Sequence, residues 1–160
     1  MTTPQKVYWD SCIWIALLNK EGGRFENITP LFNRAKNKEL IIYTSILSLV
    51  EVAKTKNYKA SDPERDAYDK EGFGGIFFYN FIERIQLDIP VALLARSFVE
   101  HNELKPLDAI HLASACHYSC DVIYTYDTKL LKLNGKTSPE GHPLIISEPP
   151  PPEEPPLPLQ

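Results

Sequence analysis

The stretch that decides the fold is "KVYWDSCIWIALL", residues 6–18, in which strand-forming and bulky apolar residues surround one acid, Asp10. Its first part predicts a short buried strand. Its second part predicts a helix over 11–20, with Ile13, Leu17 and Leu18 on one side. An ionised carboxylate is costly to bury unless something compensates its charge. Asp10, at the junction of the two elements, therefore needs a partner.

The same alternation of strand and helix patterns continues along the chain. Further strands are predicted over 40–44, 121–127 and 143–147. Further helices are predicted over 26–39, 45–57, 76–87, 91–102 and 106–119. Short strands that alternate with longer helices are typical of a mainly parallel sheet covered on both faces. We therefore expect an α/β fold with three layers, α/β/α, and a loop or poorly packed turn over the polar residues 58–75.

Length and composition indicate one domain and a tail. The chain has 160 residues, enough for a single compact core. Residues 149–160 contain seven prolines, which predict an extended polyproline-type tail after a domain over 1–148. No apolar run is long enough to span a membrane, and three cysteines do not suggest a disulfide framework. We expect a cytoplasmic protein with no membrane partner.

The net charge of −4 limits how this protein can bind nucleic acid. A protein that holds nucleic acid through a broad positive face is basic, so the net charge disfavours that mode of binding here. Binding to a phosphodiester then requires a local basic strip or bound cations. The segment "KTKNYK" offers such a strip in Lys54, Lys56 and Lys59, with Tyr58 for base stacking, although a solvated helix end explains it better.

Four acids lie where working residues gather in open parallel sheets, at the carboxyl ends of the strands. Asp10 closes the first strand and Asp127 closes the strand over 121–127, whereas Asp108 lies in the first turn of a helix that begins at Pro106. Glu51 is predicted in the second turn of the helix over 45–57. Each has an ordinary structural explanation, because Asp10 and Asp127 suit helix N-caps and Asp108 complements a helix dipole.

Taken together, the four acids favour a metal site. They are 41, 57 and 19 residues apart in sequence, so no single local cap explains all of them. Carboxylates that meet at one sheet edge repel one another and raise each other's pKa unless cations lie between them. Mg²⁺ or Mn²⁺ with oxygen ligands provides that charge, and such ions polarise a phosphoryl oxygen and activate water.

The segments around these acids resemble, in chain order, the acidic motifs of PIN-domain ribonucleases, especially VapC-type toxins. They are "VYWDSCIWIALL", "TSILSLVEVAK", "KPLDAIHLASA" and "VIYTYDTKLL". The resemblance covers residues 6–147 in element order. It implies a PIN-like α/β/α domain and Mg²⁺- or Mn²⁺-dependent endonucleolytic hydrolysis of RNA. It also implies a cognate antitoxin as partner in a toxin–antitoxin pair, and often a homodimer.

Carried over by position, Asp10, Glu51 and Asp108 resemble the three core acids, and Asp127 resembles the more variable fourth. Ser11 and Thr125 match positions where a hydroxyl supports the acids. The chain departs from the family pattern at Lys129, which stands where an apolar or aromatic residue is common, in the long segment 58–75 and in the proline tail.

Two other readings of the resemblance stay open, namely a PIN-like binding module without catalysis and a PIN nuclease of RNA processing without an antitoxin. A receiver domain is disfavoured because the strand over 40–44 lacks a phosphoacceptor Asp. Cys116 and Cys120 are expected to be unpaired rather than zinc ligands, and His111 is expected to be a core or surface residue. The aromatic stripe Phe77, Phe78 and Phe81 is expected to lie in the core, with part of it available to a dimer.

Overall fold

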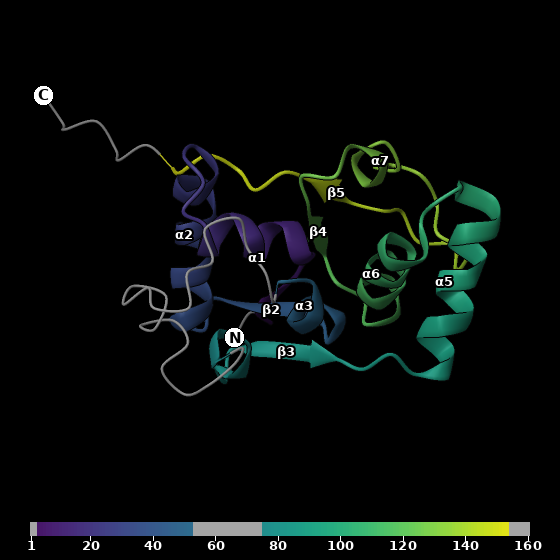
Figure 1. Cartoon of the computed structure of the whole chain (residues 1–160), viewed down its shortest axis with the longest axis horizontal. Coiled ribbons are helices and arrows are strands. Elements are labelled where there is room, and N and C mark those ends of the chain that lie inside the picture. The colour runs from purple at the N-terminus through teal and green to yellow at the C-terminus, as the bar shows by residue number, and fades with distance from the viewer. Residues whose placement is uncertain (1–2, 53–74, 154–160) are drawn as a thin grey trace, which may run out of the picture.

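A computed structural model describes residues 3–52 and 75–153. These residues form a parallel five-stranded sheet with helices on both of its faces, which confirms the predicted three-layer α/β fold (Figure 1). The strand order is β3-β2-β1-β4-β5. The strands are β1 (Gln5–Trp9), β2 (Leu40–Ser45), β3 (Ile82–Ile85), β4 (Val122–Tyr124) and β5 (Ile146–Ser147).

Strand β1 lies at the centre of the sheet because its side chains are apolar on both faces. Val7 pairs in register with Ile42 of β2 on one side and with Val122 of β4 on the other. Val7 and Trp9 face one half of the core and Tyr8 faces the other, as strand alternation requires. The carboxyl end of β1, where Asp10 follows, therefore lies beside the ends of β2 and β4.

The helices divide into two layers. One face of the sheet packs against α1 and α2 together with the 3₁₀ turn η1, and the other face packs against α5, α6 and α7. The layers are visible on the left and right of Figure 1, with α3 between them. Their bounds are α1 Ser11–Leu18, α2 Arg24–Lys36, α3 Leu47–Glu51, η1 Gly75–Phe78, α5 Ile89–Asn102, α6 Pro106–His117 and α7 Thr128–Leu131.

The predicted helix over 76–87 is wrong. Residues 75–78 form η1, and Ile82–Ile85 form strand β3, which pairs in parallel with β2. Ile82 and Ile85 are three residues apart, a spacing that also fits a helix, yet they point into opposite halves of the core. Of the aromatic stripe, Phe77 is buried as expected, whereas Phe78 is exposed. As a strand, these residues can pair with the edge of β2, which a helix cannot do.

Other elements differ from the prediction at their ends. The helix predicted over 45–57 begins at Leu47, and its later part lies outside the described residues, as does most of the predicted loop 58–75. The last strand-forming residue before Asp127 is Tyr124, so β4 is shorter than predicted. Residues 149–153 belong to no helix or strand, and the boundary at residue 148 stays a prediction. No helix in the described part of the chain is both long and apolar enough to cross a membrane.

Candidate active site

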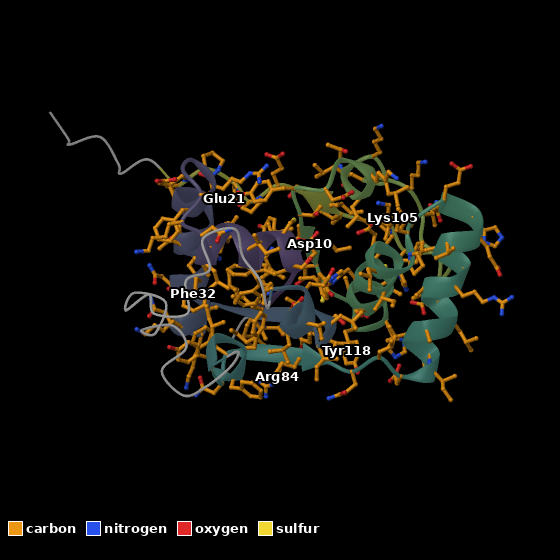
Figure 2. The ribbon with its side chains drawn as sticks, in the orientation of Figure 1. Asp10, Glu21, Phe32, Arg84, Lys105 and Tyr118 are labelled. Atoms are coloured by element: carbon orange, nitrogen blue, oxygen red, sulfur yellow. The ribbon has the colours of Figure 1, made fainter. Side chains whose placement is uncertain are left out.

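Asp10 follows β1 and caps α1. Its carboxylate Oδ1 accepts hydrogen bonds from the backbone N–H groups of Cys12, at 3.1 Å, and Ile13, at 3.4 Å. The side chain lies between α1 and β4 in the middle of the molecule (Figure 2), and the residue is only 4% exposed. The capping explanation from the sequence is therefore right for this residue, but backbone caps supply no counter-charge.

Two further groups donate hydrogen bonds to Asp10. The Thr125 hydroxyl, just beyond β4, donates to Oδ2, and the Cys12 thiol donates to Oδ1 over 2.7 Å. Thr125 Oγ1 also accepts the backbone N–H of Asp127 at 2.9 Å, so one hydroxyl links two of the predicted acids. The expected hydroxyl beside the acids is thus present in Thr125. Burial and the neighbouring Asp10 raise the pKa of Cys12, which keeps its thiol protonated as a donor.

Burial raises the pKa of Asp10 above its ordinary value of 3.8. The imidazole of His111 and the hydrogen bonds from Cys12, Thr125 and Ile13 lower it in part. The net direction is upward, so these contacts do not fully compensate the desolvated charge.

Asp108 and Asp127 face the same region. Asp108 lies in the first turn of α6, which begins at Pro106 as predicted, and it is half-buried. Asp127 caps α7 by accepting the backbone N–H groups of Lys129 and Leu130 at 2.8 and 3.1 Å. Burial raises the pKa of Asp108, and the negative charge of Asp127 raises it further.

The same carboxyl also responds to the other two acids. His111 lowers the pKa of Asp108, whereas the charges of Asp10 and Glu51 each raise it, after burial and Asp127. A carboxyl whose pKa is raised by three other carboxylates lies in a region where negative charge is only partly compensated. The four acids predicted from the sequence are therefore electrostatically coupled through Asp108.

Glu51 reaches this region differently from the prediction. It is the last residue of the short helix α3 rather than a residue of a second turn in a long one. Its Oε2 lies 2.6 Å from Nε2 of His111, which is 2% exposed and belongs to α6. The other ring nitrogen, Nδ1, lies 2.7 Å from the hydroxyl of Tyr8 on β1. His111 is thus a core histidine, as expected, but one that contacts the predicted site.

The donor set fits a hard divalent cation in its chemistry. In the described part of the chain no lysine or arginine pairs with these four acids, and the ion pair they make is the one between Glu51 and His111. Within residues 3–52 and 75–153, no three His, Cys, Asp or Glu side chains are grouped closely enough to enclose a metal ion. Mg²⁺ usually binds through one or two carboxylates and retains several waters, so it does not require such a group.

The raised pKa of Asp10 predicts how stability depends on pH without metal. The folded state holds the proton of Asp10 more tightly than the unfolded state, so this contribution is full below pH 3.8 and is lost as pH rises through the raised pKa. Urea denaturation in EDTA, from about pH 4 to about pH 7, should show wild-type stability falling relative to Asp10→Asn, by at most about 1.4 kcal/mol per pH unit. Parallel curves for the two proteins would contradict the shift.

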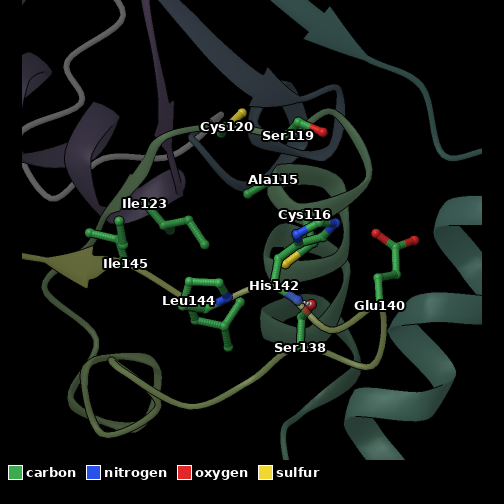
Figure 3. A pocket seen from close by; sticks show the side chains of 11 residues that line it. Ala115, Cys116, Ser119, Cys120, Ile123, Ser138, Glu140, His142, Leu144 and Ile145 are labelled. Atoms are coloured by element: carbon green, nitrogen blue, oxygen red, sulfur yellow. Dashed lines mark hydrogen bonds between the residues drawn. The ribbon is translucent and has the colours of Figure 1, made fainter.

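A separate cavity of about 220 Å³ lies between α6 and residues 138–145 (Figure 3) and contains none of the four acids. Cys116, Cys120 and His142 line it. Both cysteines are free, as predicted, and burial raises the pKa of each to about 12, which leaves the thiols protonated. This arrangement does not favour a zinc site. The predicted basic strip of Lys54, Lys56, Lys59 and Tyr58 lies outside the described residues.

A family model for the PIN domain matches residues 7–136 of the chain. The fold is similar to VapC20 of Mycobacterium tuberculosis, described as a toxin that cleaves the sarcin-ricin loop, with a TM-score of 0.58, 19% identity and coverage of 76% of this chain and 90% of that chain. It is also similar to VapBC2 of Rickettsia felis bound to a DNA fragment from their promoter, with a TM-score of 0.56, 19% identity and coverage of 89% and 98%.

A third similar structure is a toxin–antitoxin complex from Klebsiella pneumoniae, with a TM-score of 0.53, 18% identity and coverage of 77% of this chain and 88% of that chain. A search of curated proteins gave no match. At these identities the solved structures establish a shared fold, and the family model covers most of the chain from β1 to beyond α7. The chain belongs to the PIN domain family.

Proposed function

We propose that this protein is a metal-dependent endoribonuclease that hydrolyses RNA phosphodiester bonds, and that it is the toxin of a type II toxin–antitoxin pair. The observation that carries the proposal is the coupling of four acids, Asp10, Glu51, Asp108 and Asp127, with no lysine or arginine partner among the described residues. Buried and mutually repelling carboxylates are costly unless they bind a cation.

The proposed roles follow from where each acid lies. Asp10 and Asp108 supply carboxylate oxygens to Mg²⁺ or Mn²⁺ most directly, Glu51 binds or positions metal and water, and Asp127 supports a second ion or a water. A divalent cation, when bound, polarises a phosphoryl oxygen and lowers the pKa of an attacking water. Thr125 holds Asp10 in place through its hydroxyl and accepts the N–H of Asp127. No side chain of the chain acts as a covalent nucleophile.

The known structures that share this fold support the proposed biological role. Structures with the same fold include a toxin that cleaves the sarcin-ricin loop and two toxin–antitoxin assemblies. We propose that an antitoxin protein binds this chain, that RNA is its substrate and that it forms a homodimer in the cytoplasm. A nuclease of RNA processing and a binding module without catalysis are the outcomes against which the proposal is tested.

The direct test is cleavage of RNA by the purified protein. We expect cleavage with Mg²⁺ or Mn²⁺, none with EDTA, and none of a DNA of the same sequence. Attack by water leaves no 2′,3′-cyclic phosphate, whereas attack by the ribose 2′-hydroxyl does, so analysis of the product ends checks the chemistry. Cleavage that persists in EDTA would contradict the metal-dependent mechanism, and no cleavage of cellular RNA under any condition would favour the binding module.

Metal binding has its own readout in thermal stability. A ligand that binds the folded state at about 100 times its Kd stabilises it by about 2.7 kcal/mol, which corresponds to a Tm increase of roughly 5–11 °C for a domain of this size. We expect Mg²⁺ to raise the Tm of the wild type and to have little effect on Asp10→Asn. The measurement is differential scanning fluorimetry across a Mg²⁺ titration. Equal shifts in both proteins would remove Asp10 from the metal site.

A further inference from the structure

A chain of hydrogen bonds runs through the core to Glu51. The backbone N–H of Ser45, at the end of β2, donates to the Tyr8 hydroxyl over 3.0 Å. That hydroxyl lies 2.7 Å from Nδ1 of His111, and Nε2 of His111 lies 2.6 Å from Oε2 of Glu51. Tyr8 and His111 are both buried, so the contact between them is shielded from water, whereas the Glu51 side chain is 22% exposed.

The direction of the hydrogen bond between His111 and Glu51 follows from the chemistry of the two groups. A carboxylate accepts and does not donate, so Nε2–H of His111 donates to Oε2 of Glu51. Nδ1 has the Tyr8 hydroxyl as its partner, and the Tyr8 oxygen also accepts the N–H of Ser45. Both ring nitrogens of the buried imidazole therefore have hydrogen-bond partners.

Helix α6 carries Asp108 and also His111, the hydrogen-bond partner of Glu51. Asp108 and His111 are three residues apart on α6, a spacing that puts them on neighbouring positions of one helix face. Asp108 faces the site directly, and His111 holds Glu51, whose charge raises the pKa of Asp108. Glu51 itself ends a five-residue helix, and in the described part of the chain His111 is the one side chain that hydrogen-bonds to it.

We propose that His111 is a positioning residue, which holds the carboxylate of Glu51 beside Asp108 through Nε2–H, while the Tyr8 hydroxyl holds the other ring nitrogen of His111. This inference rests on the proposed nuclease function. Partners that orient the residues of a metal site typically change metal affinity or activity by about 10- to 100-fold when they are replaced. His111 contacts neither substrate nor reacting atoms and acts through Glu51.

The experiment compares His111→Gln with His111→Phe. The amide of Gln can donate to Glu51 as Nε2–H does, whereas Phe fills the space without a donor. With Mg²⁺ and RNA, we expect His111→Phe to lower kcat by about 10- to 100-fold with a smaller change in KM, and His111→Gln to recover most of the loss. His101→Gln, the same substitution on the exposed face of α5, is the matched control and should behave as wild type.

Two further measurements separate the possible outcomes. On a Glu51→Gln background, His111→Phe should have no additional effect on kcat, and an additional loss would show that His111 does not act through Glu51. In the metal-free wild type, ¹⁵N NMR should show a proton on Nε2 of His111, and Glu51→Gln should shift that signal. This spectrum needs no His111 variant, so it tests the hydrogen bond even if His111→Phe does not fold.

The inference is overturned if both His111 variants fold and have the same kcat, or if Nε2 of His111 carries no proton. Failure of the proposed function has a different signature, because the wild type itself would then cleave no RNA with Mg²⁺ or Mn²⁺. In that case the Nε2–H signal and its response to Glu51→Gln still report on the hydrogen bond between His111 and Glu51.

Discussion

Asp10→Asn is expected to abolish RNA cleavage while leaving the metal-free protein as stable as the wild type, or more stable. Asn is close to Asp in shape, and its amide oxygen can still accept the N–H groups of Cys12 and Ile13. It lacks the negative charge, which burial disfavours, so its removal does not weaken the fold. The same charge is what the proposed cation requires.

The expected loss of kcat is at least about 100-fold, the magnitude typical of removing one electrostatic group from a reacting centre. It should be measured with Mg²⁺ on a fluorescent RNA, beside urea denaturation in EDTA. Asp88→Asn is the matched control, because Asp88 caps α5 in the same way, accepting the N–H of Val91 at 3.0 Å, and belongs to none of the predicted motifs. This control should cleave RNA normally.

A purely structural role for Asp10 makes the opposite prediction. Loss of an N-cap costs about 1 kcal/mol of stability and need not change catalysis. If Asp10→Asn were less stable by that amount and still cleaved RNA at the wild-type rate, the assignment of Asp10 to the active site would be wrong.

Trp14→Ala is expected to lower the free energy of unfolding by about 3–5 kcal/mol, the usual cost of deleting a large buried aromatic side chain. Trp14 is fully buried, and its ring centroid lies 4.8 Å from that of Trp9 and 4.7 Å from that of Phe77. Its indole N–H donates to the buried Thr44 hydroxyl over 3.0 Å. A domain stabilised by 5–15 kcal/mol in total has little left after such a loss.

The contact with Thr44 ties this packing to the site. Thr44 Oγ1 lies 2.8 Å from the carbonyl oxygen of Trp9, the residue before Asp10, and 2.9 Å from the hydroxyl of Ser48 on α3, the helix that carries Glu51. Trp14→Phe keeps most of the buried ring and loses the hydrogen bond, so we expect it to cost about 1–3 kcal/mol.

Urea denaturation in EDTA measures both variants. Leu93→Ala on α5 is the control, because Leu93 is 64% exposed and a surface change of this kind stays within about 0.5 kcal/mol. A loss below about 1 kcal/mol for Trp14→Ala would contradict the packing described for α1 against β1 and η1.

The sequence was sufficient to predict the layer architecture, whereas the site role of the four acids stays a prediction. Alternating short apolar runs and longer helical patterns predicted the sheet, and helix-start signals at Pro106 and Asp127 placed α6 and α7. These features are local, so a single sequence carries them. The strand β3 was missed because Ile82 and Ile85 fit a helical spacing as well as a strand, and pairing with β2 depends on residues 40 positions earlier.

The contact between His111 and Glu51 could not be predicted from local sequence patterns either. The two residues are 60 positions apart, and only the fold brings α3 and α6 together. A signal was nevertheless present, since His111 lies one turn after Asp108 on the same helix and so faces the same region. Histidine in an apolar helix has two nitrogens to satisfy, and the predicted acids were the obvious partners.

The parallel sheet has a consequence for how the protein is made. Its central strand β1 leaves the ribosome early, but β4 and the hydroxyl that secures Asp10 follow much later, because Asp10 and Thr125 are 115 residues apart. At about 5–20 residues per second, translation needs roughly 6–23 s to cover that distance. A nascent chain therefore lacks the hydrogen bond from Thr125 to Asp10, and with it the complete candidate site, until nearly all of the domain has been synthesised.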